Sequence, residues 1–202
     1  ESSADTLLNH RGIQRVPSDR IELFQLREFI DGDLRTELIR LIEQDRRPST
    51  LADAGEDRYF RTSETCDLDA GEPCVRALED KLAALNGIDP AYGEPLQGQR
   101  YDVGQEFKPH NDWFYTDQEY WKLERKRGGQ RCWTAMAFLN EVEEGGHTHF
   151  VEIGASIEPK PGVLLVWNNA TVEGVPNEYT LHAGTPVIRG QKYVLTKWYR
   201  TR

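Results

Sequence analysis

The chain has 202 residues, of which 38% are hydrophobic and 29% charged, and its net charge is −9. This length and composition suit one globular domain, and the acidic balance argues against a nucleic-acid partner, whose phosphates attract clustered Lys and Arg. No apolar run approaches the ~20 residues of a membrane helix, no secretory signal opens the sequence, and the three irregularly spaced cysteines favour reduced thiols, so we expect no membrane partner and a cytoplasmic location.

The first elements are read from hydrophobic spacing. Residues 1–20 are polar and weakly patterned, so we expect a loose N-terminal arm. The segment IELFQL at 21–26 alternates and predicts a strand. Apolar residues at helical spacing over about 33–46, ended by Pro48, then predict a helix.

A second helix is predicted over residues 72–88. Pro73 falls in its first turn and Gly87 follows its end, which is the usual order of these two residues around a helix. We therefore expect residues 21–94 to form a helical layer.

After residue 95 short alternating or apolar segments dominate, separated by Gly, Asn and Pro. Six of them predict strands: LQGQRYDV, CWTAMAFLN, HTHFVEI, GVLLVWNN, EYTLHAG and KYVLTKWYR. Short strands at this spacing are typical of an antiparallel sandwich or jelly roll. The predicted fold class is mostly β with N-terminal helices (α+β). One domain, residues 21–202, would consist of the helical layer and a jelly-roll, or double-stranded β-helix, core at about 95–202.

The stretch YDVGQEFKPHNDWF, residues 101–114, contains the first candidates for a functional site. His110 and Asp112 lie at i and i+2, so on one strand they would point to the same face. An imidazole and a carboxylate together suit a divalent metal such as Fe(II). The alternative is a polar corner of a strand. A facial triad would need a second histidine from elsewhere.

Four histidines compete for that place. His10 lies in the predicted arm and is discounted. His147 and His149 form an HxH pair of the kind found in cupins, which leaves a zinc cupin as an alternative. His182 is favoured, because the turn-rich AGTPVIRG that follows it should reverse the chain into a neighbouring strand.

Lys192 follows ten residues after His182 and could point into the same barrel. A cation there needs an anion. A dicarboxylate cosubstrate that chelates the metal at its other end would supply one. The alternative is a surface lysine on a hairpin.

These segments together resemble the prolyl 4-hydroxylase family of Fe(II)/2-oxoglutarate dioxygenases, in its short bacterial form. Besides the segment around His110, the resemblance rests on GGQRCWTAMAFLNEVEEGGHTHF, on LHAGTPVIRGQKYVLTKW and on RTSETCDLD at 61–69, which is similar to an RTS segment upstream of the barrel. It runs from about residue 20 to the C-terminus, with the blocks in the expected order.

The resemblance implies a site residue by residue. The iron ligands would be His110, Asp112 and His182. The 2-oxoglutarate site would comprise Lys192, on the distal carboxylate, with Tyr101 and Thr148. Arg131 and Trp198 match positions that line the peptide channel.

Residues 47–66 lack strong periodicity and could supply a mobile flap over the peptide groove. Arg61 is the candidate for linking that flap to the site. Its alternative is a surface arginine.

Some positions depart from the family pattern. His147 stands where relatives have Glu and His149 where they have a small apolar residue; these histidines could support a second metal or face solvent. Phe107 replaces a frequent Tyr, which would remove one substrate hydrogen bond. Thr185 replaces a common Cys, a change we expect to be harmless. Trp113 could be a core aromatic or a substrate shelf.

The function implied by the resemblance is hydroxylation of a peptidyl proline, coupled to decarboxylation of 2-oxoglutarate to succinate. O2 would be the second cosubstrate and ascorbate a further cofactor. Halogenating relatives replace the carboxylate ligand with a small residue, so Asp112 argues for hydroxylation. The partner would be a proline-containing peptide or protein, with weak steering of basic segments by the net charge of −9. The alternatives are a related dioxygenase acting on a free amino acid or small metabolite, and a non-catalytic metal-binding jelly roll.

Overall fold

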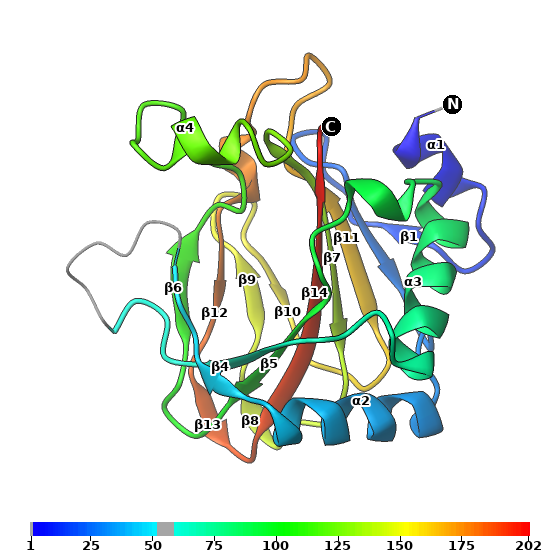
Figure 1. Ribbon diagram of the computed structural model, residues 1–202, viewed down its shortest axis with the longest axis vertical. Helices are drawn as coiled ribbons and strands as arrows, with labels where there is room; N and C mark the ends of the chain where they lie inside the picture. The colour runs from blue at the N-terminus through cyan, green and yellow to red at the C-terminus, as the bar shows by residue number, and fades with distance from the viewer. Residues whose placement is uncertain (1, 52–58) are drawn as a thin grey trace.

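The structure is a computed structural model, and it describes residues 2–51 and 59–202 (Figure 1). Within these residues eight strands form the larger sheet, and all neighbouring strands in it run antiparallel. Their order is β1 (Gln14–Arg15), β2 (Leu23–Leu26), β11 (Leu164–Asn168), β7 (Arg131–Phe138), β14 (Lys192–Arg200), β5 (Gln97–Tyr101), β4 (Glu64–Asp67) and β3 (Arg47–Pro48).

A second antiparallel sheet faces the first. Over the same described residues its order is β10 (Ala155–Ile157), β9 (Thr148–Phe150), β12 (His182–Gly184) and β6 (Phe107–His110), and a short pair, β13 (Val187–Arg189) with β8 (Glu144–Gly145), lies at its end. Each of the six predicted strand segments overlaps a strand of these sheets. The predicted fold class, a jelly-roll core with N-terminal helices, is confirmed.

Alternation along strands of the larger sheet divides the molecule into two cores. On β11, Leu164 and Val166 pack in the cluster that includes the helices, whereas Leu165 and Trp167 pack in the cluster between the sheets. Successive side chains of a strand point to opposite faces, so both clusters need the same strands. The inner cluster also receives Phe150 from β9, and this cluster holds the two sheets together.

Helices α2 (Gly32–Gln44) and α3 (Pro73–Asn86) cover the outer face of the larger sheet (Figure 1). The Asp31 side chain caps α2 by accepting a hydrogen bond from the Leu34 N–H. In α3, Pro73 occupies the first turn and Gly87 ends the helix with φ at 69°, a left-handed conformation that glycine adopts without a Cβ penalty. Both predicted helices are therefore present. The described residues also contain helix α4 (Trp121–Glu124) and the 3-10 turns η1 (Pro90–Tyr92) and η2 (Glu178–Thr180).

The N-terminal residues are not a loose arm, and this prediction is wrong. They form α1 (Ser3–Leu8), which contacts α3, and then strand β1. Ser2 and Asp5 make a reciprocal capping box, and Ala4 and Leu7 are buried at a spacing of one helical turn. The predicted helical layer is likewise mixed, because β2, β3 and β4 join the larger sheet from residues before 95.

The predicted flap and the predicted absence of a membrane helix can be compared with the structure only over the described residues. The predicted flap, 47–66, includes residues 52–58, which lie outside the described residues; on either side of them the chain forms β3 and β4. Among the described helices, none combines the length and the apolar character that crossing a membrane requires.

The docking of α1 can be tested with two neighbouring leucines. Leu7 is fully buried and Leu8 is 49% exposed. Leu7→Ala should lower the free energy of unfolding by about 2–5 kcal/mol, because it leaves a cavity against α3. Leu8→Ala should change it by no more than ~0.5 kcal/mol. Urea unfolding of the two variants measures the difference. Equally small effects of the two substitutions would support the original prediction of a loose N-terminal arm.

Candidate active site

The three predicted metal ligands lie together where β6 meets β12. His110 is the last residue of β6 and lies directly opposite His182, the first residue of β12, in the antiparallel ladder. Asp112 does not lie on the strand as predicted, because β6 ends at His110 and the carboxylate comes from the loop after it. The register of the two strands therefore joins the histidines, and the loop adds the carboxylate.

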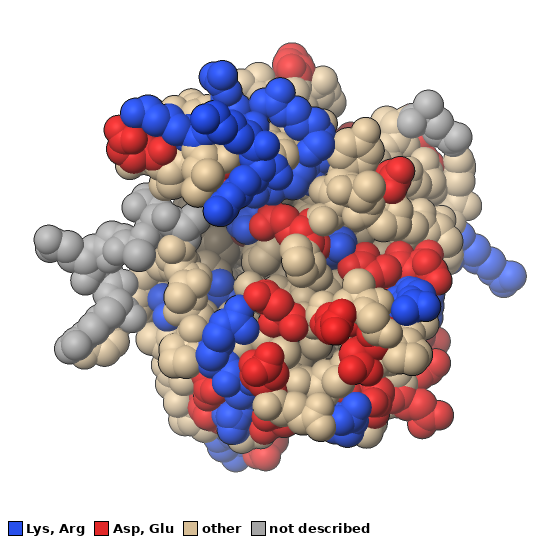
Figure 2. Space-filling model, viewed as in Figure 1, with Lys and Arg blue, Asp and Glu red and all other residues tan. Residues whose placement is uncertain are grey.

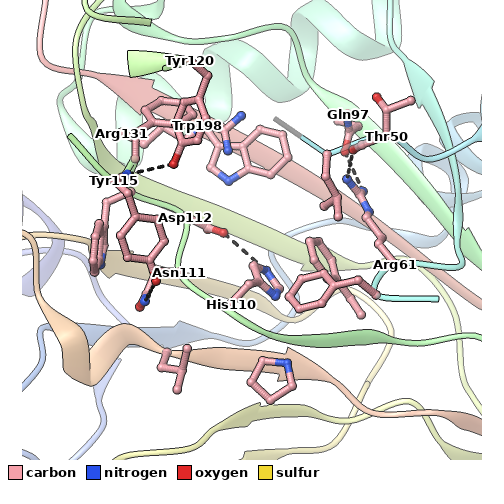
Figure 3. Close-up of a pocket in the computed structure, with 17 residues that line it drawn as sticks. Thr50, Arg61, Gln97, His110, Asn111, Asp112, Tyr115, Tyr120, Arg131 and Trp198 are labelled. Carbon is pink, nitrogen blue, oxygen red and sulfur yellow. Dashed lines mark hydrogen bonds and ion pairs between the residues drawn. The ribbon is translucent and has the colours of Figure 1, made fainter. Parts of the chain in front are cut away.

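The ligand atoms of this triad converge on one point. The Nε2 atoms of His110 and His182 each lie 3.6 Å from Oδ1 of Asp112, and the three ligand atoms are all within 4.8 Å of one another. Figure 3 shows the His110 and Asp112 side chains directed toward each other at the floor of the pocket. In the described part of the chain this is the one group of three or more His, Cys, Asp or Glu side chains with such geometry.

Hydrogen bonds behind the ligands fix their orientation. Nδ1 of His110 lies 2.7 Å from the Lys108 carbonyl, and Nδ1 of His182 lies 2.8 Å from the Thr180 carbonyl. A carbonyl only accepts, so each Nδ1 carries the proton and each Nε2 presents a lone pair to the shared point. This is the outer-shell arrangement typical of metal-binding histidines.

The carboxylate is held in the same way. The hydroxyl of Thr134 donates to Oδ2 of Asp112 at 2.7 Å and accepts a hydrogen bond from Asn169 at 2.8 Å. Trp167 donates in turn to Asn169 at 2.9 Å. This buried chain leaves Oδ1 of Asp112 free to face the histidines. Neither Thr134 nor Asn169 was predicted as a site residue.

Burial and mutual charge set the protonation of the triad. Burial, followed by the nearby charge of His182, lowers the pKa of His110 to about 3. Burial alone would raise the pKa of the Asp112 carboxyl, but the neighbouring histidines, Arg131 and the Thr134 hydrogen bond bring it below its ordinary value. At neutral pH His110 is therefore neutral and Asp112 ionised, which are the forms that bind a divalent cation.

An inner cavity of about 30 Å³ adjoins the triad between the two sheets. The three predicted cosubstrate residues, Tyr101, Thr148 and Lys192, all line it. Gln99 and Thr196 line it as well, and the Thr196 hydroxyl donates to Gln99 at 3.1 Å. Neither of these two was predicted. Gln99 lies two residues before Tyr101 on β5 and Thr196 lies four residues after Lys192 on β14, so the alternation of side chains along a strand would have placed both on the cavity side.

Lys192 is the unusual residue of this cavity. It is 3% exposed, its Nζ lies 5.1 Å from the centre of the Tyr101 ring, and within the described residues no carboxylate forms an ion pair with it. Burial lowers its pKa to about 7. The alternative of a surface lysine is wrong. A buried cation without a counterion is costly, so the cavity is suited to an anion.

A larger outer pocket of about 670 Å³ opens onto the triad from the other side. Arg131 and Trp198 lie in its wall, and Trp198 also lines the inner cavity, so the two spaces meet there. Arg131 is fixed by two hydrogen bonds to Glu94, of 2.6 and 2.9 Å, and its guanidinium lies 4.0 Å from the centre of the Trp198 ring. The wall contains seven aromatic side chains, of which the sequence predicted only some as site residues. They are Phe60, Phe107, Trp113, Phe114, Tyr115, Tyr120 and Trp198.

Arg61 lies in the opposite wall of this pocket (Figure 3). It is 9% exposed, so the alternative of a surface arginine is wrong. It donates to Gln97 at 2.9 Å and to the Thr50 carbonyl at 3.4 Å, and it lies 4.7 Å above the Phe107 ring. Arg61 thus connects the pocket wall to the residue stretch before 52. Its predicted role in a flap stays a prediction.

The remaining candidates do not join the triad. Thr148 and Phe150 are buried on β9, so His147 and His149, at alternate positions, face away from the core. Nδ1 of His147 contacts the Ser156 hydroxyl at 3.3 Å. The zinc cupin alternative is not supported. Phe107, in place of Tyr, stacks on the His110 ring with centroids 3.5 Å apart, and Trp113 lines the outer pocket as a shelf would.

Comparison with known proteins gives consistent results. A family model of the 2OG-Fe(II) oxygenase superfamily matches residues 96–200. The chain is 30% identical to prolyl 4-hydroxylase 2 of Arabidopsis thaliana, over 98% of this chain and 73% of that protein. Its fold is similar to the viral collagen prolyl hydroxylase of Paramecium Bursaria Chlorella virus-1 (TM-score 0.71, 24% identity, 89% of this chain and 96% of the other). It also resembles a prolyl-4-hydroxylase of Pseudomonas putida (TM-score 0.61, 22% identity, 99% and 97%).

The choice of the second histidine can be tested with His182→Ala and His147→Ala. Loss of an outer-shell partner already costs a metal site about 10–100-fold in affinity, so loss of a ligand should cost more. We expect His182→Ala to bind Fe(II) at least about 100-fold more weakly, and His147→Ala to bind it like the parent chain. Anaerobic calorimetric titration with Fe(II) measures both. Equal weakening in two folded variants would contradict the assignment.

The environment of Lys192 predicts a pH dependence of anion binding. An anion binds the protonated amine, so affinity for 2-oxoglutarate should be constant below pH 7, where Lys192 is charged, and fall by up to about tenfold per pH unit above it. Lys192→Ala should weaken binding about 10–100-fold, as expected for a lost charged hydrogen bond of ~1.5–3 kcal/mol, and abolish this pH dependence. Titrations on Mn(II)-loaded protein at pH 6 to 9 test this. If Lys192→Ala weakened Mn(II) and 2-oxoglutarate binding equally, Lys192 would be structural.

Proposed function

The chain belongs to the prolyl 4-hydroxylase family of the 2OG-Fe(II) oxygenase superfamily, and on this premise we propose that it hydroxylates proline residues within a peptide or protein, with decarboxylation of 2-oxoglutarate to succinate. The observation that carries the proposal is the junction of two cavities at the triad. One contains the buried amine of Lys192, with which no carboxylate of the described residues forms an ion pair, and the other is a large pocket with aromatic walls.

The triad fits Fe(II) by its donor set. Two imidazoles and one carboxylate are the ligands of the facial triad that non-haem iron oxygenases use. Both Nε2 atoms and Oδ1 of Asp112 face one point, and the other atom of each group is occupied by a protein hydrogen bond. His110, Asp112 and His182 would therefore hold the metal.

The inner cavity fits 2-oxoglutarate by its charge. Lys192 is a buried amine without a carboxylate partner among the described residues, and hydroxyl groups of Tyr101, Thr148 and Thr196 come from the strands around it. A carboxylate here would gain a charge-assisted hydrogen bond in a site with little water, where such bonds are strong. The other end of the same molecule would reach the triad.

The bound metal and 2-oxoglutarate supply the oxidative chemistry, in which O2 is consumed, succinate and CO2 form and a C–H bond is hydroxylated. The protein supplies position and shielding. His110, Asp112 and His182 would hold the metal where the two cavities meet, so that both cavities would give access to it. The ring of Phe107 against His110 and the indole of Trp167 against His182 exclude water from the back of the site.

The outer pocket suits an extended peptide. Its volume of about 670 Å³ exceeds what a single amino acid needs, and its aromatic walls offer flat faces to a proline ring. The Nε1–H group of Trp198 is buried at the junction and has no hydrogen-bond partner among the described residues, so a substrate carbonyl would satisfy it. These features favour a peptidyl substrate over the alternative of a free amino acid or small metabolite.

The proposal has three further parts. Ascorbate as a reductant follows from the family resemblance alone. A cytoplasmic location is supported by Cys66, Cys74 and Cys132, which are free thiols. The substrate is the one partner that we propose.

The proposal is tested with a proline-containing peptide, the same peptide with alanine in place of proline, and free proline. With Fe(II), 2-oxoglutarate and ascorbate, we expect mass spectrometry to find one added oxygen on the first peptide and none on the other two. Succinate should form in equal amount. Hydroxylation of free proline but not of the peptide would favour the small-molecule alternative. Binding of metal and 2-oxoglutarate without any product would favour a non-catalytic module.

A further inference from the structure

The residues that follow Tyr120 concentrate positive charge at the edge of the outer pocket. The six residues 122–127 (KLERKR) include four cationic side chains and one anionic one, in a chain whose net charge is −9. Figure 2 shows these cations as a continuous group above the hollow of the pocket, while acidic and basic side chains mix over the face below. We name the four cations, Lys122, Arg125, Lys126 and Arg127, the basic rim.

The basic rim is attached directly to the pocket wall. Tyr115 and Tyr120 line the pocket, and hydrogen bonds of helical type continue from Tyr120 to Arg127. At about 1.5 Å of rise per residue, Arg125 lies within roughly 8 Å of Tyr120 along this turn. A peptide that leaves the pocket on this side therefore meets the cations within a few residues.

The charge of the basic rim is balanced only in part. Glu124 forms ion pairs with the buried Arg200 and, at 3.5 Å, with Arg127, while Lys122 pairs with the exposed Glu119 at 3.0 Å. Arg125 and Lys126 are exposed, and no carboxylate in the described part of the chain forms an ion pair with either. Two cations at least are thus available to an external anion.

The rim is also held in place, although it lies in a connection between strands. The Arg202 guanidinium donates to the Arg125 carbonyl at 3.0 Å, and the Arg202 N–H donates to the Gly128 carbonyl. The Gln130 side chain binds both the N–H and the carbonyl of Phe114, at 2.8 and 2.7 Å, and so closes the base of the segment. Cations held at a fixed distance from the pocket can select the position of a partner's charge.

We propose that the basic rim binds acidic residues that flank the target proline on one side, so that the preferred substrates are acidic proline-containing segments. This inference rests on the proposed function and specifies its substrate. An extended peptide advances about 3.3 Å per residue, so the acidic side chains would lie several positions from the proline. A nucleic-acid strand fits less well, because the acidic remainder of the protein would repel a long polyanion.

The experiment compares three peptides of equal length with one proline: one with neutral flanks, one with acidic residues before the proline and one with acidic residues after it. The protein variants are the parent chain, Arg125→Glu/Lys126→Glu and a control, Arg11→Glu/Arg27→Glu. The control changes the net charge by the same amount as the rim variant. Its two exposed residues lie next to β1 and β2, at the β1 edge of the larger sheet. The measurement is kcat/KM at two salt concentrations, with thermal unfolding to verify folding.

With the parent chain, we expect kcat/KM for one of the two acidic peptides to be at least fivefold higher than for the neutral peptide. This ratio should decrease at high salt. Arg125→Glu/Lys126→Glu should abolish this preference and leave the neutral peptide within twofold, while the control keeps it. Equal use of all three peptides, or equal loss in the control, would overturn the inference and leave the proposed function intact. So would an oligonucleotide that binds the rim without any peptide preference. Hydroxylation of none of the peptides would refute the proposed function, and the inference with it.

Discussion

Strand β14 is buried along its whole length, and the arrangement of both cores and both cavities depends on its two faces. It lies between β7 and β5 in the larger sheet, and each of its residues pairs with at least one of these neighbours. Tyr193, Leu195 and Tyr199 pack against the helices, whereas alternate residues from Lys192 to Trp198 line the cavities between the sheets. A shift of one residue would exchange these sets and place an aromatic side chain where Lys192 stands. Stability and function therefore fix the same register.

The site carries charges that the protein itself balances only in part. Asp112 is compensated by the Thr134 hydrogen bond and the charge of Arg131, and Arg61 by Gln97 and the Thr50 carbonyl. Lys192 has aromatic rings around it, and no carboxylate in the described part of the chain forms an ion pair with it. Desolvating an ion without a partner opposes folding, so a ligand that supplies the missing charge binds to a site already prepared for it. The selectivity of the inner cavity for a dicarboxylate would follow from this imbalance.

The sequence was sufficient for the residues of the triad but not for their arrangement. His110, Asp112, His182 and Lys192 could be chosen from motifs and spacing, because residue type and order carry that information. The pairing of His110 with His182 depends on strand register, which is set by contacts distant in sequence. Helix α1 was missed because only two of its residues are buried, and its capping box uses Asp where Glu or Gln is usual. Glu94, Gln97 and Gln99 sit in segments without a distinctive pattern and become site residues only through the fold.

Net charge is a poor guide to the potential at the pocket, because it averages over distances that the solvent screens. At physiological ionic strength the field of an exposed charge decays over about 8 Å, so a substrate at the pocket responds to the nearest side chains and hardly to the far surface. The total of −9 describes the whole chain, whereas residues 122–127 set the potential at the pocket edge. A peptide approaching from afar would meet weak repulsion if acidic, and attraction only once it lies against the rim. Such a short-range field contributes more to the orientation of the bound peptide than to its capture, and orientation is what places one proline, rather than its neighbours, over the triad.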